Sequence, residues 1–245
     1  MRYCLTLLLL LSFAIIPSVQ AQHNSLTRKE KKQGWILLFD GRSATGWKGA
    51  FLDSFPAKGW RIENGELMVE PSGGAESTNG GDIVTKDLYS DFELILDFKL
   101  TEGANSGIKY FVDPAQPKPV NPRSAFGLEF QLLDDAKHPD AKMGREGNRT
   151  LSSLYDLIPA SSNKKPNPIG NWNQARIYSK GSHVEHWLNG MKVLEYERGS
   201  DRFKELIAIS KYKPIPGFGL VKEGRILLQD HGDKVYFRNI KLRKL

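Results

Sequence analysis

The 245-residue sequence contains a single cysteine, Cys4, close to its start. One thiol cannot close a disulfide within the chain, and it cannot supply a zinc site built from several cysteines. Other familiar spacings are also absent: the sequence has no H-E-x-x-H motif, no EF-hand loop and no glycine-rich turn between a strand and a helix. The fold must therefore be stabilised by its hydrophobic core alone, for which the chain is long enough.

Long apolar runs are scarce, and the one present lies at the N-terminus. Arg2 precedes a mostly apolar run over residues 5–16, and Val19-Gln20-Ala21 resembles a cleavage site with small flanking residues. A membrane anchor is the alternative, but the run is shorter than the roughly 20 apolar residues that a spanning helix needs. We therefore expect residues 1–21 to be a signal peptide. The mature protein should be exported to the periplasm or the extracellular space, with no membrane span.

The body of the chain has no strong excess of charge. The net charge is +7, and residues 22–33 contribute much of it through four basic side chains against Glu30. The basic residues are not interleaved with aromatic ones in the manner of nucleic-acid-binding proteins, so we expect no nucleic-acid partner. We predict a basic N-terminal tail or short helix over residues 22–33 and a single domain over residues 34–245.

Short strand-like segments separated by turns make up most of this domain. Residues 60–63 and 66–69 flank Asn64-Gly65, the strongest short-range signal for a hairpin. Residues 91–100 alternate between apolar and polar side chains, as expected of a strand with one buried face. Only residues 202–210 show a helical pattern. Many short strands with glycine-containing turns are typical of an all-β sandwich or barrel. The other expected strands are 82–86, 108–112, 127–133, 175–179, 183–188, 191–196, 225–229 and 234–241.

The segment 127–133 gives the first indication of function. Leu128, Phe130 and Leu132 fall on one face of the expected strand, so Glu129 and Gln131 share the other face. In a two-sheet sandwich the outer face of a sheet can line a groove, although an ordinary solvated face also displays carboxylates. We predict that Glu129 and Gln131 face a groove.

Polar residues recur in the same way elsewhere. Gln229 and His231 share a face near the C-terminus, Asn105 leads into the strand at 108–112, and Lys86 ends the segment 82–86. His186 lies on the opposite strand face from its neighbours His183 and Glu185, which weakens any metal site built from these three. Alternation alone does not decide whether His186 faces the core or the groove.

The chain resembles the 3-keto-disaccharide hydrolase domain family. Residues 127–134 follow the family pattern G-x-E-x-Q-x-x-D, and other family-like motifs occur in order from about residue 34 to the C-terminus. Each motif is weak alone, but the ordered set is specific. These motifs are Trp35-Ile36-Leu37-Leu38-Phe39-Asp40-Gly41, Asn105-Ser106-Gly107-Ile108, Leu154-Tyr155-Asp156, Trp172-Asn173, His186-Trp187-Leu188-Asn189-Gly190 and Leu228-Gln229-Asp230-His231-Gly232. The resemblance implies an all-β, concanavalin-like jelly-roll sandwich of two antiparallel sheets with a concave groove and long loops.

The resemblance also implies an exported carbohydrate-active enzyme that cleaves glycosidic bonds of 3-keto-glycosides or 3-keto-disaccharides. Glucanases of this fold carry E-x-D-x-x-E, where this chain has Glu129, Gln131 and Asp134, so an ordinary retaining carboxylate pair is not expected. In a 3-keto sugar the ketone acidifies the C2 proton. A base can then remove this proton, and the C1 substituent leaves by elimination or is lost in a net hydrolysis.

On this basis we predict that Glu129 and His231 act as base and acid, in an order that the sequence does not decide. The predicted substrate-binding residues are Gln131, Gln229, Asn105, Lys86, His186, Trp172, Asp134 and Tyr155. Among them the amides would bind hydroxyls or the enolate oxygen, and Lys86 would stabilise negative charge. A divalent metal ion could polarise the ketone instead, and the sequence assigns no ligands to it. The alternatives are a non-catalytic, lectin-like carbohydrate-binding domain, an ordinary glucanase-type glycosidase, or a structural protein with a polar groove.

Overall fold

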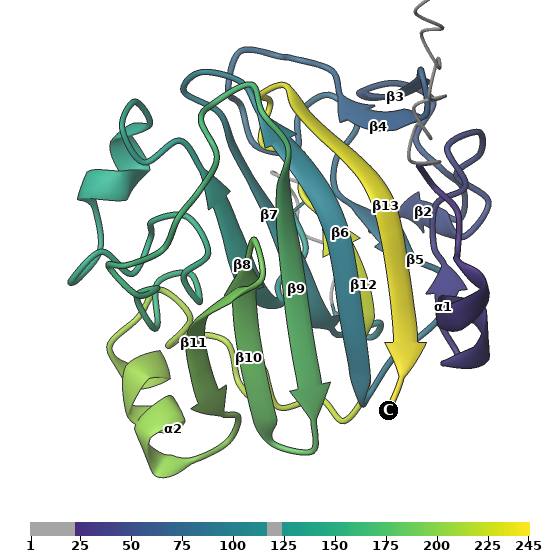
Figure 1. The fold of residues 1–245 in the computed structure, drawn as a ribbon. Helices are drawn as coiled ribbons and strands as arrows, with labels where there is room; N and C mark the ends of the chain where they lie inside the picture. The colour runs from purple at the N-terminus through teal and green to yellow at the C-terminus, as the bar shows by residue number, and fades with distance from the viewer. Residues whose placement is uncertain (1–22, 117–123) are drawn as a thin grey trace, which may run out of the picture.

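Two antiparallel β-sheets packed face to face form the domain in the computed structural model, which describes residues 23–116 and 124–245 (Figure 1). The predicted all-β sandwich is confirmed. The predicted signal peptide lies outside the described residues. Within the described residues, no helix combines the length and the apolar character needed to cross a membrane.

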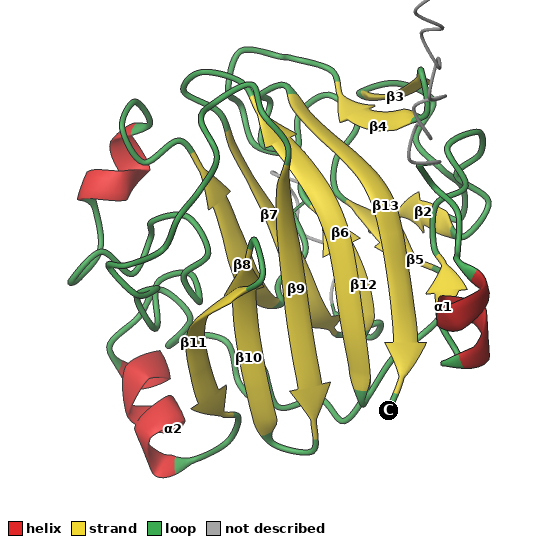
Figure 2. Cartoon of the chain, in the orientation of Figure 1, coloured by secondary structure: helices red, strands yellow, loops and turns green. Residues whose placement is uncertain are grey.

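The larger sheet has eight strands, in the order β11-β10-β9-β6-β13-β4-β3 with β1 paired to β13, and the smaller has five, in the order β2-β5-β12-β7-β8. The larger sheet contains β1 (Ile36–Leu37), β3 (Trp60–Glu63), β4 (Glu66–Val69), β6 (Phe92–Leu100), β9 (Asn173–Lys180), β10 (His183–Leu188), β11 (Met191–Glu197) and β13 (Val235–Lys244). The smaller sheet contains β2 (Trp47–Gly49), β5 (Ile83–Thr85), β7 (Asn105–Val112), β8 (Leu128–Leu133) and β12 (Arg225–Leu228). Figure 2 shows the helices at the periphery of the sandwich; they are α1 (Arg28–Lys32), the 3-10 helix η1 (Pro139–Lys142) and α2 (Asp201–Ala208).

Local sequence signals account for several of these elements. Asn64 and Gly65 have φ values of 51° and 78°, which suits the two-residue turn joining β3 to β4. The helix α2 begins where the Ser200 side chain accepts a hydrogen bond from Phe203 N at 3.2 Å. The helical pattern predicted at 202–210 is therefore observed, displaced by one or two residues.

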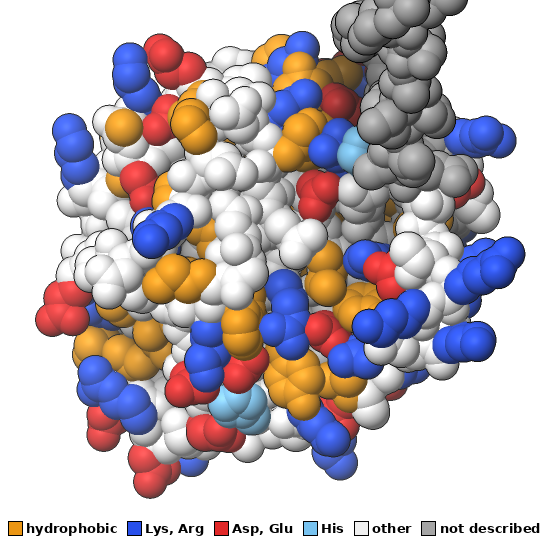
Figure 3. All heavy atoms as spheres, in the orientation of Figure 1, with side chains coloured by type: hydrophobic (Ala, Val, Ile, Leu, Met, Phe, Trp, Pro, Cys, Tyr) orange, Lys and Arg blue, Asp and Glu red, His pale blue; other side chains and the backbone are white. Residues whose placement is uncertain are grey.

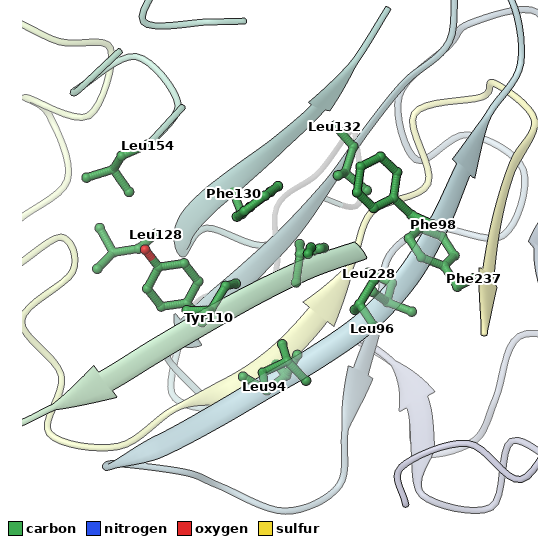
Figure 4. Packing of buried hydrophobic residues seen from close by; sticks show 14 of the residues in the cluster. Leu94, Leu96, Phe98, Tyr110, Leu128, Phe130, Leu132, Leu154, Leu228 and Phe237 are labelled. Atoms are coloured by element: carbon green, nitrogen blue, oxygen red, sulfur yellow. The ribbon is translucent and has the colours of Figure 1, made fainter. Parts of the chain in front are cut away.

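The alternation predicted for residues 127–133 is observed in β8. Leu128, Phe130 and Leu132 are fully buried between the sheets, where they share a core with Leu96 and Phe98 of β6 (Figure 4). Burying an aliphatic or aromatic side chain of this size contributes about 1.5–3 kcal/mol, so this row holds the register of β8 strongly. The polar side chains between these core residues consequently point to the outer face of the smaller sheet.

The basic segment before the domain is packed on it. Helix α1 begins with a capping box between Thr27 and Glu30. Asn24 accepts a hydrogen bond from Asn239 N at 2.8 Å and donates its own N–H to Asn239 Oδ1 at 2.7 Å. Glu30 also pairs with Lys241 of β13. The alternative of a short helix is therefore the one observed, docked beside β13 in place of a free tail.

The outer face of the larger sheet carries neutralising charge pairs. Glu93 of β6 lies 2.5 Å from Arg176 of β9 and 2.6 Å from Arg243 of β13. Figure 3 shows basic and acidic side chains next to one another across this face. The unbalanced polar groups that could act on a substrate are found on the other sheet.

Candidate active site

A pocket of about 370 Å³ lies on the outer side of the smaller sheet. Glu129 of β8 stands opposite Lys109 of β7 in the strand register, and both side chains reach the pocket. Gln229, just after β12, adds a third polar group, while residues 124–127 and 211–215 supply most of the walls. We call this site the Glu129 pocket; its lining residues are Glu76, Lys109, Ser124, Phe126, Gly127, Glu129, Lys211, Tyr212, Pro214, Ile215 and Gln229.

The Glu129 side chain occupies space that only a glycine leaves open. A Cβ atom added to Gly107 of β7 would stand 2.2 Å from Glu129 Oε1. The amide of Gln131, which is opposite Gly107 in the register, donates to Ser106 O at 3.0 Å and to Glu129 Oε1 at 3.3 Å in the orientation that satisfies its neighbours. The carboxylate is therefore positioned from two strands at once.

A buried ion pair lies beside this carboxylate. Lys109 Nζ donates to Ser124 Oγ at 3.1 Å and to Ala125 O at 3.0 Å, and it lies 3.7 Å from Asp82 Oδ2. Burial opposes the charged form of Lys109, but Asp82 and Glu129 outweigh burial and raise the pKa of its ammonium group. Lys109 is therefore a fixed positive charge, and its hydrogen bonds to Ser124 and Ala125 hold it in place.

Glu129 itself is 4% exposed. Burial raises the pKa of the Glu129 carboxyl, and Lys109 and Lys211 oppose that rise. A raised pKa makes an ionised carboxylate a stronger base, which suits general base catalysis near neutral pH.

The second lysine of the pocket comes from the loop after α2. Lys211 Nζ lies 4.1 Å from the ring centroid of Tyr155, whose hydroxyl donates to Asp140 Oδ2 at 2.8 Å. The residue remains partly open to solvent, and its surroundings lower the pKa of the ammonium group, first through burial and also through Lys109. Tyr155, a predicted substrate-binding residue, thus contacts Lys211 without lining the pocket.

The other predicted residues of the smaller sheet lie near the pocket. Gln229 lines it and donates to Glu76 Oε1 at 3.2 Å. The Gln131 amide lies 3.4 Å from Asn105 Oδ1, so these two amides are brought together. His231, two residues beyond Gln229, does not line the pocket. Burial raises the pKa of the Glu76 carboxyl, but Lys109 first, then Ser124, and then His231 and Lys211 lower it below its ordinary value.

His186 does not belong to the site. It is completely buried between the sheets, where Nδ1–H donates to Ser152 O at 3.0 Å and Nε2 accepts from Tyr110 Oη at 2.7 Å. Both ring nitrogens are thereby satisfied within the core. Of the two orientations that the sequence left open, the structure shows the core one, which corrects the prediction of a substrate-binding role.

Three more predicted residues lie away from the pocket. Trp172 lies over the larger sheet, where its ring centroid is 3.9 Å from Arg238 Cζ and 4.6 Å from Lys99 Nζ. Lys86 is exposed at the end of β5. The Asp134 carboxylate accepts hydrogen bonds from three backbone N–H groups, at 2.8, 3.1 and 3.3 Å, and so stabilises a turn. We therefore withdraw Trp172, Lys86 and Asp134 from the predicted substrate-binding set.

Several residues of the pocket were missed by the sequence analysis. Lys109 shares strand parity with Gly107, so a lysine inside an otherwise apolar strand was a usable signal. Lys211 and Glu76 lie in loops, where no periodicity reports on the direction of a side chain. Their presence in the pocket depends on how the loops pack.

Two clusters of possible metal ligands occur among the described residues. One combines His138, His231 and Asp233, and the other combines His183, Glu185 and Glu195; in each, the candidate ligand atoms lie within 4.8 Å of one another. Only the first is next to predicted site residues, because Asp233 Oδ2 accepts a hydrogen bond from Asn105 N at 2.9 Å.

Comparison with known proteins agrees with this architecture. Residues 34–243 match the family model described as the 3-keto-alpha-glucoside-1,2-lyase-like domain. A 3-keto-disaccharide hydrolase of Bacteroides thetaiotaomicron is 36% identical over 92% of this chain and 83% of its own length. A Parabacteroides distasonis crystal structure, named as a candidate glycosyl hydrolase, superposes with a TM-score of 0.78 at 33% identity, covering 91% of this chain and 100% of the other.

More distant structures share the fold alone. A Bacillus subtilis protein with a galectin-like fold is 14% identical, with a TM-score of 0.50 over 91% of this chain and 95% of its own. The close matches extend over nearly the whole described domain and include the strands that carry the Glu129 pocket. The chain therefore belongs to the 3-keto-alpha-glucoside-1,2-lyase-like domain family.

Proposed function

We propose that this protein cleaves the glycosidic bond of 3-keto-glycosides, with Glu129 as the base that removes the C2 proton. Family membership supports cleavage of 3-keto sugars, because a relative of 36% identity is named as a 3-keto-disaccharide hydrolase. The observation that carries the assignment is the Glu129 pocket itself: a buried carboxylate of raised pKa that faces a cavity together with two lysines.

The reaction has two steps. Glu129 takes the C2 proton, and the electron pair of the C2–H bond forms a C2=C3 double bond while negative charge moves to the C3 oxygen. The C3 ketone then re-forms, and the electron pair of the C2=C3 double bond moves to form C1=C2 as the C1–O bond breaks. The departing oxygen takes a proton. Addition of water across C1=C2 afterwards would complete a net hydrolysis.

The lysines take over the charge-stabilising role that the sequence analysis gave to Lys86. The donors of Lys109 are engaged by Ser124 and Ala125, so it acts as a fixed positive charge that stabilises the enolate electrostatically. Lys211 packs on an aromatic ring and remains open to solvent, so its ammonium can give a proton to the departing oxygen and recover one from water.

An ordinary glycosidase mechanism makes a different demand. Glu76 also lines the pocket, and its pKa is lowered while that of Glu129 is raised. Such a split is a feature of paired catalytic carboxyls. The elimination mechanism requires the C3 ketone, however, whereas the carboxylate-pair mechanism does not. Comparing 3-keto-glucosides with their unoxidised parents therefore separates the two mechanisms.

The decisive experiment is Glu129→Gln assayed on a 3-keto-glucoside in deuterium oxide. General base catalysis contributes about 10²- to 10⁴-fold, so we expect kcat to fall by that factor, together with the loss of deuterium exchange at C2. Glu205→Gln, on the exposed face of α2, is the matched control and should behave as wild type. Unchanged turnover in Glu129→Gln, or cleavage of the parent glycosides alone, would refute the assignment.

We also propose that the protein acts after export, with residues 1–21 removed. Support comes from the N-terminal apolar run and its small-residue cleavage site. N-terminal sequencing of the protein recovered from the cell envelope and medium should start near residue 22. A cytoplasmic protein with an intact N-terminus would contradict the proposal.

A further inference from the structure

Three potential metal ligands meet beside Asn105, the residue at which β7 begins. His231 lies two residues beyond Gln229, which lines the pocket, and His138 precedes the 3-10 helix η1. The two imidazole rings are 6.1 Å apart between centroids and nearly perpendicular, at 86°. Asp233 has one carboxylate oxygen on Asn105 N, which leaves the other oxygen available. The cluster therefore joins two separate segments of the chain, the loop between β8 and η1 and the turn between β12 and β13.

His231 has an unsatisfied ring nitrogen at this point. Its Nδ1 atom is buried and has no hydrogen-bond partner among the described residues. Buried polar atoms are almost always paired, and an exception marks a bound water or ion, a strained group or a catalytic role. The position of His231 beside a second histidine and a carboxylate favours an ion.

The second cluster shows what a site without an ion looks like. His183 bonds to Glu197 Oε1 through Nδ1 at 2.8 Å and lies 3.3 Å from Glu185 Oε1 through Nε2. Lys192 Nζ is 2.6 Å from Glu195 Oε2. The hydrogen bond to Glu197 first, and then Glu185, raise the pKa of the His183 ring, which favours the protonated form over the neutral form that a metal needs. This cluster is satisfied by its own charges.

We propose that His138, His231 and Asp233 bind one divalent transition-metal ion. Two imidazoles and one carboxylate suit ions such as Zn²⁺, Co²⁺, Mn²⁺ or Fe²⁺ better than Mg²⁺ or Ca²⁺, which prefer oxygen ligands alone. Three protein ligands leave further coordination positions open. If the proposed function holds, an ion held beside Asn105, and two residues from the pocket residue Gln229, would polarise the ketone of the sugar or a neighbouring hydroxyl.

One local rearrangement must accompany binding. His138 Nδ1 accepts a hydrogen bond from Asp140 N at 3.2 Å, which places the proton of the neutral ring on Nε2. A metal on Nδ1 displaces this N–H directly, and a metal on Nε2 moves the ring proton to Nδ1, so the bond opens in either case. The Asp140 amide should therefore exchange with deuterium faster when the metal is bound, even though metal binding usually slows exchange.

Co²⁺ is the probe that tests the site without any sugar. Tag-free full chain is titrated with Co²⁺ and followed by visible absorption and calorimetry. We expect one equivalent to bind with ligand-field bands. Loss of a supporting outer-shell group costs about 10- to 100-fold in affinity, so Asp233→Asn and His231→Ala should weaken binding by at least about 100-fold. Asp233→Asn keeps an acceptor for Asn105 N, and circular dichroism confirms that each variant is folded.

His183→Ala is the matched control, because it removes the histidine of the other cluster. Retained Co²⁺ binding in His183→Ala with loss in His231→Ala supports the site; the opposite pattern, or no stoichiometric binding by wild type, overturns it. The readout is independent of turnover. Bound Co²⁺ with no cleavage of 3-keto-glucosides would reject the proposed function and leave the site standing, whereas cleavage of 3-keto-glucosides by a protein that binds no stoichiometric Co²⁺ would do the reverse.

Discussion

Gly107→Ala tests whether the position of the Glu129 carboxylate, and not only its presence, controls activity. The new Cβ would stand 2.2 Å from Glu129 Oε1, 2.8 Å from Cδ and 3.1 Å from Cγ. Ordinary contact begins near 3.4 Å, so the carboxylate oxygen must move by about 1.2 Å. A misplacement of roughly 1 Å can cost about 10²-fold in rate, and we expect kcat/KM on a 3-keto-glucoside to fall by that factor or more.

The same substitution should affect stability very little. The atoms that clash belong to the end of a flexible side chain, which can rotate away at small cost. Replacing a strand glycine with alanine also removes conformational freedom from the unfolded chain, which offsets part of that cost. We expect the free energy of unfolding, measured by urea denaturation, to change by less than about 1 kcal/mol. The prediction is therefore a large loss of activity in a protein of nearly normal stability.

Gly46→Ala provides the comparison, because the nearest atom to its new Cβ is Leu38 O at 3.9 Å. This variant should retain both activity and stability. Wild-type kcat/KM in Gly107→Ala would show that Glu129 does not act from its observed position. A large loss of stability would show that the carboxylate is too tightly packed to move, and that the pocket is more rigid than argued above.

Two further predictions concern pH. Burial lowers the pKa of His186 to about 4, below its ordinary 6.5, so the unfolded chain takes up a proton on this ring before the folded protein does. Wild type should therefore lose about 3 kcal/mol of unfolding free energy between pH 6.5 and 4 that His186→Gln does not lose, as measured by urea denaturation; parallel pH profiles would contradict this. In Lys211→Met, removal of a cation that holds down the pKa of Glu129 should raise that pKa further, so the acid limb of the kcat/KM profile should move to higher pH. Lys213→Met is the control. An unshifted acid limb in Lys211→Met would show that Lys211 does not influence the pKa of Glu129.

Strands that follow a strict alternation could be predicted from the sequence. The bounds predicted at 183–188 agree with β10, and those of the Asn-Gly hairpin agree with β3 and β4. The reason is that a two-residue period and a tight turn are both local properties of the chain. The strand β2 (Trp47–Gly49) was missed because it is too short to show a period and, unlike the equally short β5, contains no β-branched residue.

The beginning of β7 shows where local information stops. The strand starts at Asn105, three residues earlier than predicted. The prediction omitted Asn105, Ser106 and Gly107 because these residues have little intrinsic preference for strands. They are nevertheless paired with Leu133, Leu132 and Gln131 of β8. Sheet context overrides propensity at these positions, and the same context brings Gly107 beneath Glu129.

The alternation of side chains along a strand also explains which part of the site could be predicted from the sequence. The outward direction of Glu129 follows from its apolar neighbours in β8, so one strand was sufficient. The opposition of Lys109 and Glu129 depends on the register between two strands, which no single strand reports. Lys211 enters the pocket from a loop more than 80 positions away, and only the packed structure shows it.

His186 and Glu129 show why burial alone could not separate a structural residue from a candidate catalytic one. Both are polar side chains on strands, and both are nearly inaccessible, at 0% and 4% exposure. Each ring nitrogen of His186 has a hydrogen-bond partner inside the core, so neither nitrogen remains free to bind a substrate. The Glu129 carboxylate instead faces a cavity, where its charge is only partly compensated by lysines and its pKa remains raised. A polar group with unused capacity beside open space can act on a substrate, whereas a fully paired one in the core cannot.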